Sequence, residues 1–251
     1  MTARFKDYFS GHAADYATYR PHYPAALFTW LAQQCRQHDR VWDCATGNGQ
    51  AAIALAAHFQ QVIATDASAA QLEQAPQHPR VTYQVALAET PDMAAHSVDL
   101  VTVAQAVHWF DLEPFYAAVQ RVLKPEGLFA IWCYGCPQVA MPSLNAQLEH
   151  YYDHILDDFW TPERRLVETG YRTLPFPFTE VDAPTYMMTV SWTLAELMGY
   201  LFTWSATQRY MQHHGDNPLM ALAEQMAASW PSDRLLITWP VSVRAGQQVS
   251  R

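Results

Sequence analysis

The feature that most constrains this chain is a glycine-containing turn between two short apolar runs. Residues 40–50 read RVWDCATGNGQ, and residues 62–66, which follow an alanine-rich stretch, read VIATD. This order predicts a strand, a tight turn, a helix and a second strand that ends on Asp66. Glycines let the backbone approach a ligand at a strand end, and an acid there accepts hydrogen bonds from ribose hydroxyls. The run therefore predicts a site for a ligand that carries a nucleoside.

The turn does not fit a dinucleotide. A dinucleotide fingerprint needs a third glycine for close helix packing, whereas this run offers only Gly47 and Gly49 before Gln50 begins the helix. Asp43, at the end of the first strand, would also repel a pyrophosphate. A carboxylate there suits a cationic ligand with an amino group, and S-adenosylmethionine has that group and a sulfonium. A nucleotide-dependent oxidoreductase stays open as an alternative.

The turn resembles the cofactor loop of class I S-adenosylmethionine-dependent methyltransferases, most closely the small-molecule branch of the trans-aconitate type. The family's loop is an acid followed by three glycines at alternate positions, and residues 43–49 depart from it at Ala45. A methyl group at Ala45 is expected to restrict the backbone to non-glycine angles. Asp66 resembles the family's ribose-binding acid.

Two further motifs follow in the family's order. Ala88 and Glu89 resemble the pair after the third strand that lies near the adenine. Residues 121–127 resemble the turn before the fifth strand, with Glu126 in place of a more usual glycine. The resemblance covers about residues 10–135. It implies these cofactor-binding residues: Arg20, Asp43, Ala45, Thr46, Gly47, Gly49, Asp66, Ala67, Ala88, Glu89 and Gln105.

Strand and helix signals alternate through the first half, which predicts an α/β fold. With the resemblance, we expect a Rossmann-like, seven-stranded, mostly parallel sheet with helices on both faces, an antiparallel last strand and a helical lid inserted after the fifth strand. Buried strands are expected at 62–65, 81–86, 98–104 and 128–134. The chain is interpreted as a single methyltransferase domain: an N-terminal cap at 1–35, a cofactor-binding core at 36–135, and the lid with the last two strands at 136–251.

Helix signals outside the glycine turn come from capping residues and apolar spacing. Asp111 can cap a helix that Lys124 and Pro125 end. In the second half we expect helices at 143–157, from the capping box 193–196 to about 213, and at 218–229. Strand-like runs remain at 178–192 and 235–243, and Pro240 predicts an edge or hairpin position for the latter.

The N-terminal residues 8–24 resemble the Y-x-x-x-R-P-x-Y-P stretch that precedes the core in methyltransferases of the trans-aconitate type. This segment is expected to form part of the lid. Arg20 within it could bind the cofactor's carboxylate with its planar fork of donors, or be a surface arginine beside a helix start.

Residues 104–111 follow the expected fourth strand, where ligands of open α/β sheets bind. His108 is placed to face the methyl acceptor and could act as a general base, although His108 and Trp109 could instead only pack a helix turn. Aromatic residues are also frequent in the second half and could line a pocket for an apolar or anionic small molecule. The expected substrate-binding residues are Trp109, Tyr134 and Trp204.

Composition limits the kinds of ligand and partner that the chain is expected to bind. The 15 basic and 24 acidic side chains give a formal charge of −9, which disfavours a nucleic-acid surface because that affinity comes mainly from Lys and Arg. Cys133 and Cys136 have C-x-x-C spacing but lack a second ligand pair, so we expect no metal. Apolar runs are too short for a membrane span, and no signal-peptide pattern opens the chain, which predicts a cytoplasmic protein. The oligomeric state stays open.

These features together predict transfer of a methyl group from S-adenosylmethionine to a small-molecule acceptor, such as a carboxylate or a hydroxyl. A non-catalytic module that binds the same cofactor stays open as an alternative, because Ala45 alters the loop.

Overall fold

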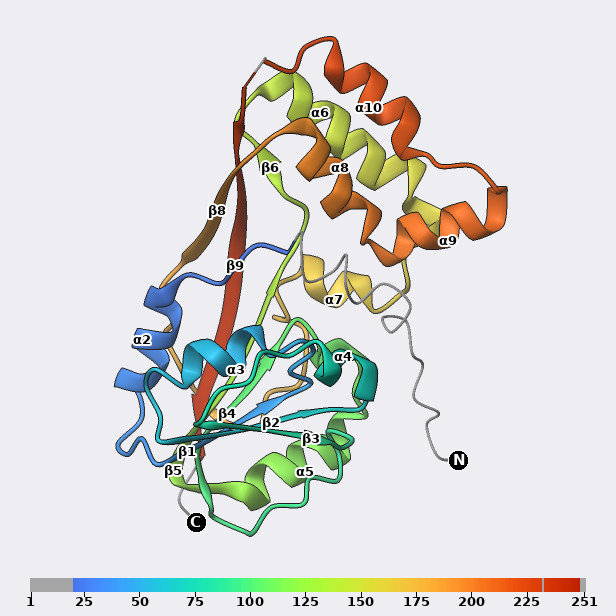
Figure 1. Cartoon of the computed structure of the whole chain (residues 1–251). Helices are drawn as coiled ribbons and strands as arrows, with labels where there is room; N and C mark the ends of the chain where they lie inside the picture. Colours follow the sequence, from blue (N-terminus) through green and yellow to red (C-terminus); the bar gives the residue numbers. More distant parts are fainter. Residues whose placement is uncertain (1–19, 232, 249–251) are drawn as a thin grey trace.

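The computed structural model describes residues 20–231 and 233–248 and contains one mixed sheet (Figure 1). Its parallel part has the strand order β3-β2-β1-β4-β5. The strands are β1 (Arg40–Cys44), β2 (Gln61–Asp66), β3 (Val81–Val85), β4 (Val98–Ala104) and β5 (Leu123–Tyr134). The order reverses between β1 and β4, and in open α/β sheets such a switch point is where ligands bind.

The sheet continues through β9 (Leu235–Gln247), which is antiparallel to β5. On the same side as β5, and beyond its end, the short β6 (Gln138–Val139) also pairs with β9. On the other side, β9 pairs with β7 (Thr179–Val181) and β8 (Tyr186–Trp192). β7 and β8 share that edge end to end, as β5 and β6 share the opposite one. The sheet therefore has seven strand positions, and this confirms the predicted Rossmann-like fold with an antiparallel last strand.

The sequence predicted an edge or hairpin position for the strand that contains Pro240, and the edge position is wrong. β9 has neighbours on both sides, and Pro240 is the partner of Met187 in β8. On the opposite side, β5 pairs as far as Val241 and β6 begins to pair at Thr238. Proline lacks a backbone donor, and it is accommodated here because it lies in the gap between β5 and β6.

Both faces of the parallel sheet are buried, and alternate residues of β5 divide between them. Leu128, Ala130 and Trp132 belong to one core cluster, together with residues of α2 (Ala25–Gln33) and α3 (Gln50–Leu55). Phe129, Ile131 and Cys133 belong to the other, together with α5 (Leu112–Val122) and α7 (Arg164–Glu168). This two-residue period is what a strand covered by helices on both sides produces. The short α4 (Ala69–Glu73) follows β2.

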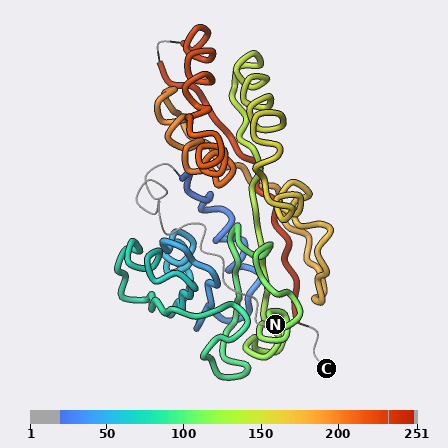
Figure 2. The backbone as a smooth tube through the Cα atoms, turned by 90° about the vertical axis from the view of Figure 1, so that its right-hand side faces the viewer, coloured from blue at the N-terminus to red at the C-terminus, as the bar shows by residue number. Residues whose placement is uncertain are grey.

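A helical cap stands at one end of β9, and Figure 2 shows that it lies at the opposite end of the elongated molecule from α5. The cap consists of α6 (Pro142–His150), α8 (Leu194–Phe202), α9 (Ser205–His214) and α10 (Leu219–Ala227). The first of these helices follows β5 as predicted, while the other three come between β8 and β9. Its apolar residues join the α2–α3 core cluster, so cap and core are continuous.

The cap helices begin largely where the sequence predicted. The Thr193 capping box is present. The Thr193 hydroxyl accepts a hydrogen bond from the Glu196 nitrogen, and the Glu196 carboxylate accepts one from the Thr193 nitrogen. The single helix expected from there to about 213 is wrong, because the chain breaks between α8 and α9. At the break Trp204 is extended (φ −72°, ψ 134°) and buried among aromatic rings. After α6 the chain continues as a π-helical turn, η3 (Tyr151–Ile155). The described residues also form the 3₁₀ turns η2 (Val107–Trp109) and η4 (Asp157–Phe159).

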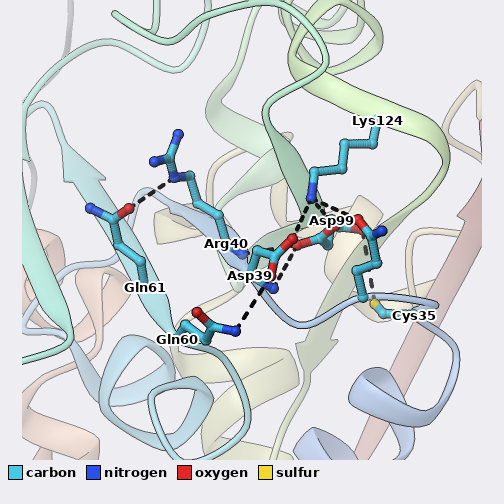
Figure 3. Close-up of polar contacts among 8 residues, drawn as sticks. Cys35, Asp39, Arg40, Gln60, Gln61, Asp99 and Lys124 are labelled. Carbon is cyan, nitrogen blue, oxygen red and sulfur yellow. Dashed lines mark hydrogen bonds and ion pairs between the residues drawn. The ribbon is translucent and has the colours of Figure 1, made fainter.

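The amino end of β4 carries a compact polar network (Figure 3). The Asp99 carboxylate is 4% exposed and accepts hydrogen bonds from the backbone nitrogens of Asp39 and Arg40 at 2.9 and 2.8 Å. Lys124 pairs with Asp99 at 2.7 Å and with Asp39 at 3.0 Å. These contacts tie the starts of β1, β4 and β5 together at the edge that faces away from the predicted ligand.

None of the helices within the described ranges has the length and apolar character needed to cross a bilayer.

Candidate active site

The glycine turn after β1 takes left-handed backbone angles at alternate residues. Ala45, Gly47 and Gly49 have φ values of 52°, 58° and 81°. The expectation that Ala45 would hold the backbone to non-glycine angles is therefore wrong. Hydrogen bonds on the adjacent Thr46 fix the turn: its nitrogen donates to Thr65 O at 2.9 Å and its hydroxyl to Asp43 at 2.5 Å. The Cβ of Ala45 then costs about 1 kcal/mol of strain.

Asp43 lies wholly buried at the end of β1. One carboxylate oxygen accepts from the Thr46 hydroxyl at 2.5 Å and the other from the Thr102 hydroxyl of β4 at 2.7 Å. Burial raises the pKa of Asp43 to about 6, although both hydroxyl bonds act in the opposite direction. In this geometry Asp43 joins the turn to β4, and its contact with a ligand amino group stays a prediction.

Asp66, at the end of β2, is half-buried beside the turn. One of its oxygens accepts from the Gly47 nitrogen at 2.8 Å and the other from the Ser68 nitrogen at 2.9 Å. A carboxylate can accept about four hydrogen bonds, and its contact with ribose hydroxyls stays a prediction. Among the described residues, a Cβ at Gly47 would meet only Gln71 Oε1, at 3.8 Å.

The other predicted cofactor residues lie at the same edge of the sheet. Ala67 follows Asp66 and is half-buried, and Ala88 is buried after β3. Glu89 accepts a hydrogen bond from the Asp111 nitrogen at 3.1 Å, so it caps the start of α5 where the Asp111 side chain makes no cap. Gln105 (φ 57°) bridges β4 and β5, because its side-chain amide bonds the Tyr134 nitrogen and carbonyl at 2.8 and 2.9 Å.

A pocket of about 80 Å³ opens beside these strand ends. One water needs about 10–15 Å³ by the same kind of measure, so the pocket has room for a small organic group. Six of its lining residues were singled out from the sequence: Arg20, Gln105, His108, Trp109, Tyr134 and Trp204. The structure thus brings together all three predicted substrate residues, the predicted base and two predicted cofactor residues.

The described part of the pocket lining carries positive charge. Its charged residues are Arg20 and Arg164, and no Asp or Glu within 20–231 and 233–248 lines it. Arg20 Nη1 donates to the Tyr134 hydroxyl at 3.0 Å, and its guanidinium lies 5.1 Å from the ring centre of Tyr200. Arg164 lies 4.8 Å from the Trp160 ring centre, and its Nε donates to the Tyr152 hydroxyl at 2.6 Å. A positive pocket in a chain of formal charge −9 favours an anionic ligand.

His108 faces this pocket from η2, next to β4. Its Nδ1 lies 2.7 Å from the hydroxyl of Tyr171. Burial, and secondly the positive charge of Arg164, lower the pKa of His108 to about 3. The imidazole is therefore neutral at physiological pH.

Several pocket residues were not among the sequence-based candidates: Gly135, Thr161, Arg164 and Ser205. Arg164 is the important omission. It begins the short α7, and no spacing in the sequence relates it to the end of β4. The lid prediction for residues 8–24 lies outside the described residues except for 20–24.

The four cysteines are free thiols. Cys133 is buried in β5 and Cys136 follows it, as predicted. Across residues 20–231 and 233–248, His, Cys, Asp and Glu side chains form no group of three that could hold a metal ion.

A parallel sheet with a switch point, a glycine turn and an acid after the second strand defines a Rossmann-like nucleoside-binding enzyme, and comparison with known proteins gives the family. A model described as a methyltransferase domain matches residues 42–131. A Dictyostelium discoideum protein named as a methyltransferase is 31% identical over 231 residues, which cover 90% of this chain and 88% of the relative. Methyltransferase cfoB of Aspergillus candidus is 26% identical over 92% of this chain and 76% of its own length.

A solved structure from Anaeromyxobacter dehalogenans, described as a type II methyltransferase, is 42% identical to this chain. It superposes with a TM-score of 0.86 over 92% of this chain and 99% of its own length. The chain belongs to the class I S-adenosylmethionine-dependent methyltransferases.

Proposed function

We propose that this enzyme transfers a methyl group from S-adenosylmethionine to a small anionic acceptor, with a carboxylate as the first choice. The observation that carries the proposal is the pocket whose described lining contains Arg20 and Arg164 and no Asp or Glu. The sequence resemblance to the trans-aconitate branch agrees with an acid as acceptor. The small volume of the pocket, about 80 Å³, and the formal charge of −9 favour a small molecule over a nucleic acid.

The cofactor's place is proposed at the ends of β1, β2 and β3. Asp66, which the Gly47 and Ser68 nitrogens hold at the end of β2, would bind the ribose hydroxyls. Glu89, and Ala67 and Ala88, would lie near the adenine. Arg20 would bind the cofactor's carboxylate at the mouth of the pocket, because a guanidinium matches a carboxylate with two parallel donors. When bound, S-adenosylmethionine supplies a methyl group activated by its sulfonium.

The pocket's task is to hold the acceptor in line and to exclude water. Transfer to a carboxylate forms a carbon–oxygen bond and breaks the carbon–sulfur bond, so the opposite charges of acceptor and sulfonium are both lost and no proton moves. Arg164 would bind the part of the acceptor that stays anionic or neutralise the carboxylate as it enters, while Trp160 and Trp204 form apolar walls. Positioning and desolvation then supply the acceleration.

The cofactor assignment is tested by calorimetry with S-adenosylmethionine and its demethylated product. Asp66→Ala removes a charge-assisted hydrogen-bond acceptor and should weaken binding by about 1.5–3 kcal/mol, whereas Asp92→Ala, at an exposed position, should leave it unchanged. Absence of binding by the wild type would overturn the proposal.

The acceptor class is tested by measuring release of the demethylated cofactor with panels of carboxylic acids, alcohols and amines. Arg164→Gln should raise the KM for an acid by about 10–100-fold, since a hydrogen bond to a charged group is worth about 1.5–3 kcal/mol. Arg165→Gln is the matched control, because Arg165 is exposed and lies outside the pocket. Equal effects of the two variants would count against the anionic acceptor. Cofactor binding without turnover of any panel member would favour the non-catalytic module.

A further inference from the structure

Tyr171 reaches His108 from a strained turn after α7. Gly170 and Tyr171 have φ values of 62° and 61°, and a non-glycine residue at such an angle is uncommon. A Cβ on Gly170 would lie 2.7 Å from Ser242 Oγ. The Tyr171 carbonyl accepts from Arg244 Nη1 at 2.7 Å and its nitrogen donates to Leu166 O at 2.8 Å. Hydrogen bonds therefore fix the Tyr171 backbone at both its nitrogen and its carbonyl. Strained backbone angles of this kind cluster at functional sites.

The protons shared by Tyr171 and His108 can be assigned by counting donors and acceptors. Tyr171 is 0% exposed, and burial raises its pKa well above the ordinary value, so the phenol keeps its proton. Among the described residues, the hydroxyl has one hydrogen-bond partner, His108 Nδ1. A buried hydroxyl left without an acceptor is costly. The phenol must therefore donate to Nδ1, which leaves the single proton of the neutral imidazole on Nε2.

The remaining nitrogen of His108 belongs to the pocket. Nε2 makes no hydrogen bond to any residue in the described ranges, and His108 lines the same cavity as Arg20 and Arg164. With the proton on Nε2, His108 and Arg164 both present N–H donors to an acceptor. Among the described lining residues, a nucleophile that arrives with a proton finds no base, while an anionic oxygen finds donors.

We propose that Tyr171 is a positioning residue that fixes His108 as the Nε2–H tautomer, so that His108 donates a hydrogen bond to the acceptor's anionic oxygen and does not remove a proton. The part that concerns the acceptor rests on the proposed function, whereas the tautomer does not. This role replaces the general base expected from the sequence.

The tautomer is measured without any substrate by nitrogen-15 NMR of histidine-labelled protein at pH 7. The chain has 11 histidines, so His108→Gln identifies the signal. We expect a protonated Nε2 and a hydrogen-bonded, unprotonated Nδ1 in the wild type, and loss of that hydrogen-bond shift in Tyr171→Phe. A wild-type His108 protonated at Nδ1 would overturn the proposal whether or not an acceptor is known.

Kinetics then separate a donor from a base. His108→Ala should lower kcat/KM for an acid acceptor by at least about tenfold, and His108→Gln, which keeps an N–H donor, should recover most of that loss. Tyr171→Phe should raise the acceptor KM by about tenfold without changing cofactor affinity. A His108→Gln enzyme as impaired as His108→Ala would contradict the donor role. Cofactor affinity that is absent in the wild type would instead mark failure of the proposed function.

Discussion

The two ends of the parallel strands differ in how fully their polar groups are used. At the amino end, Asp99 satisfies two backbone nitrogens and pairs with Lys124, which also reaches Asp39 (Figure 3). At the carboxyl end, the backbone turns left-handed at Ala45 and Gln105, and the pocket residues His108 and Arg164 keep donor atoms available. One edge of the sheet is closed by its own contacts, and the other keeps polar groups available for a ligand. Stability and binding should therefore respond to substitutions at opposite edges.

The largest effect is expected at the closed edge. Asp99→Ala removes the acceptor of two part-buried backbone nitrogens and a partner of Lys124, so it should lower the free energy of unfolding by about 3 kcal/mol, as measured by urea denaturation. Cofactor affinity of the folded variant should be unchanged. Arg36→Gln, in the exposed ion pair with Glu126, serves as the control and should change stability by less than about 0.5 kcal/mol. A loss of cofactor affinity in Asp99→Ala would show that the two edges are coupled.

An intermediate effect is expected at Asp43, which lies at the open edge of the sheet and whose contribution to stability depends on pH. Burial raises its pKa in the folded protein to about 6, above the ordinary value of 3.8. The stability it contributes is therefore fully present below about pH 4 and is lost as pH rises through about 6. Relative to Asp43→Asn, the wild type should lose on the order of 2 kcal/mol between pH 4 and pH 7. Parallel unfolding curves of both proteins across this range test it, and a constant difference would contradict the raised pKa.

The smallest effect is expected at Ala45. Because its φ is 52°, Ala45→Gly removes steric strain and should stabilise the protein by about 0.5 kcal/mol, after the greater flexibility of glycine in the unfolded chain is subtracted. Ala54→Gly, within α3, should instead destabilise by about 0.5–1 kcal/mol. Thermal unfolding of the pair checks both signs, and destabilisation by both substitutions would show that Ala45 is unstrained.

The open edge of the sheet was readable from the sequence, because its residues follow their strands directly. Asp43, Asp66 and Gln105 occupy strand ends that apolar runs and turn residues mark locally. Arg164 reaches the pocket, and Tyr171 reaches His108, only through the packing of α7 against β5 and η2. Local sequence patterns do not encode such long-range contacts. Their roles, like the break at Trp204, depend on tertiary structure.

The prediction of the backbone angle at Ala45 was wrong for a related reason. Propensity assigns alanine to negative φ, but the hydrogen bonds of Thr46 to Thr65 and Asp43 impose the turn on it. Pro240 is a similar case, since the gap between β5 and β6 removes the need for a donor that the sequence alone assumed. At both residues the local preference correctly predicts an unfavourable conformation or a missing hydrogen bond. It does not predict that the surrounding structure accommodates it.

The 13-residue β9 has a mechanical consequence. It runs unbroken from the core to the cap, so the two parts cannot swing about a flexible linker, and any opening between them must bend this strand. Bending meets least resistance at Trp239 and Pro240, where β9 is paired only with β8. The indole of Trp239 donates to the Tyr200 hydroxyl at 3.1 Å, and Tyr200 is a wall of the pocket. Bending of β9 at this point would therefore shift a hydrogen-bond partner of the pocket wall.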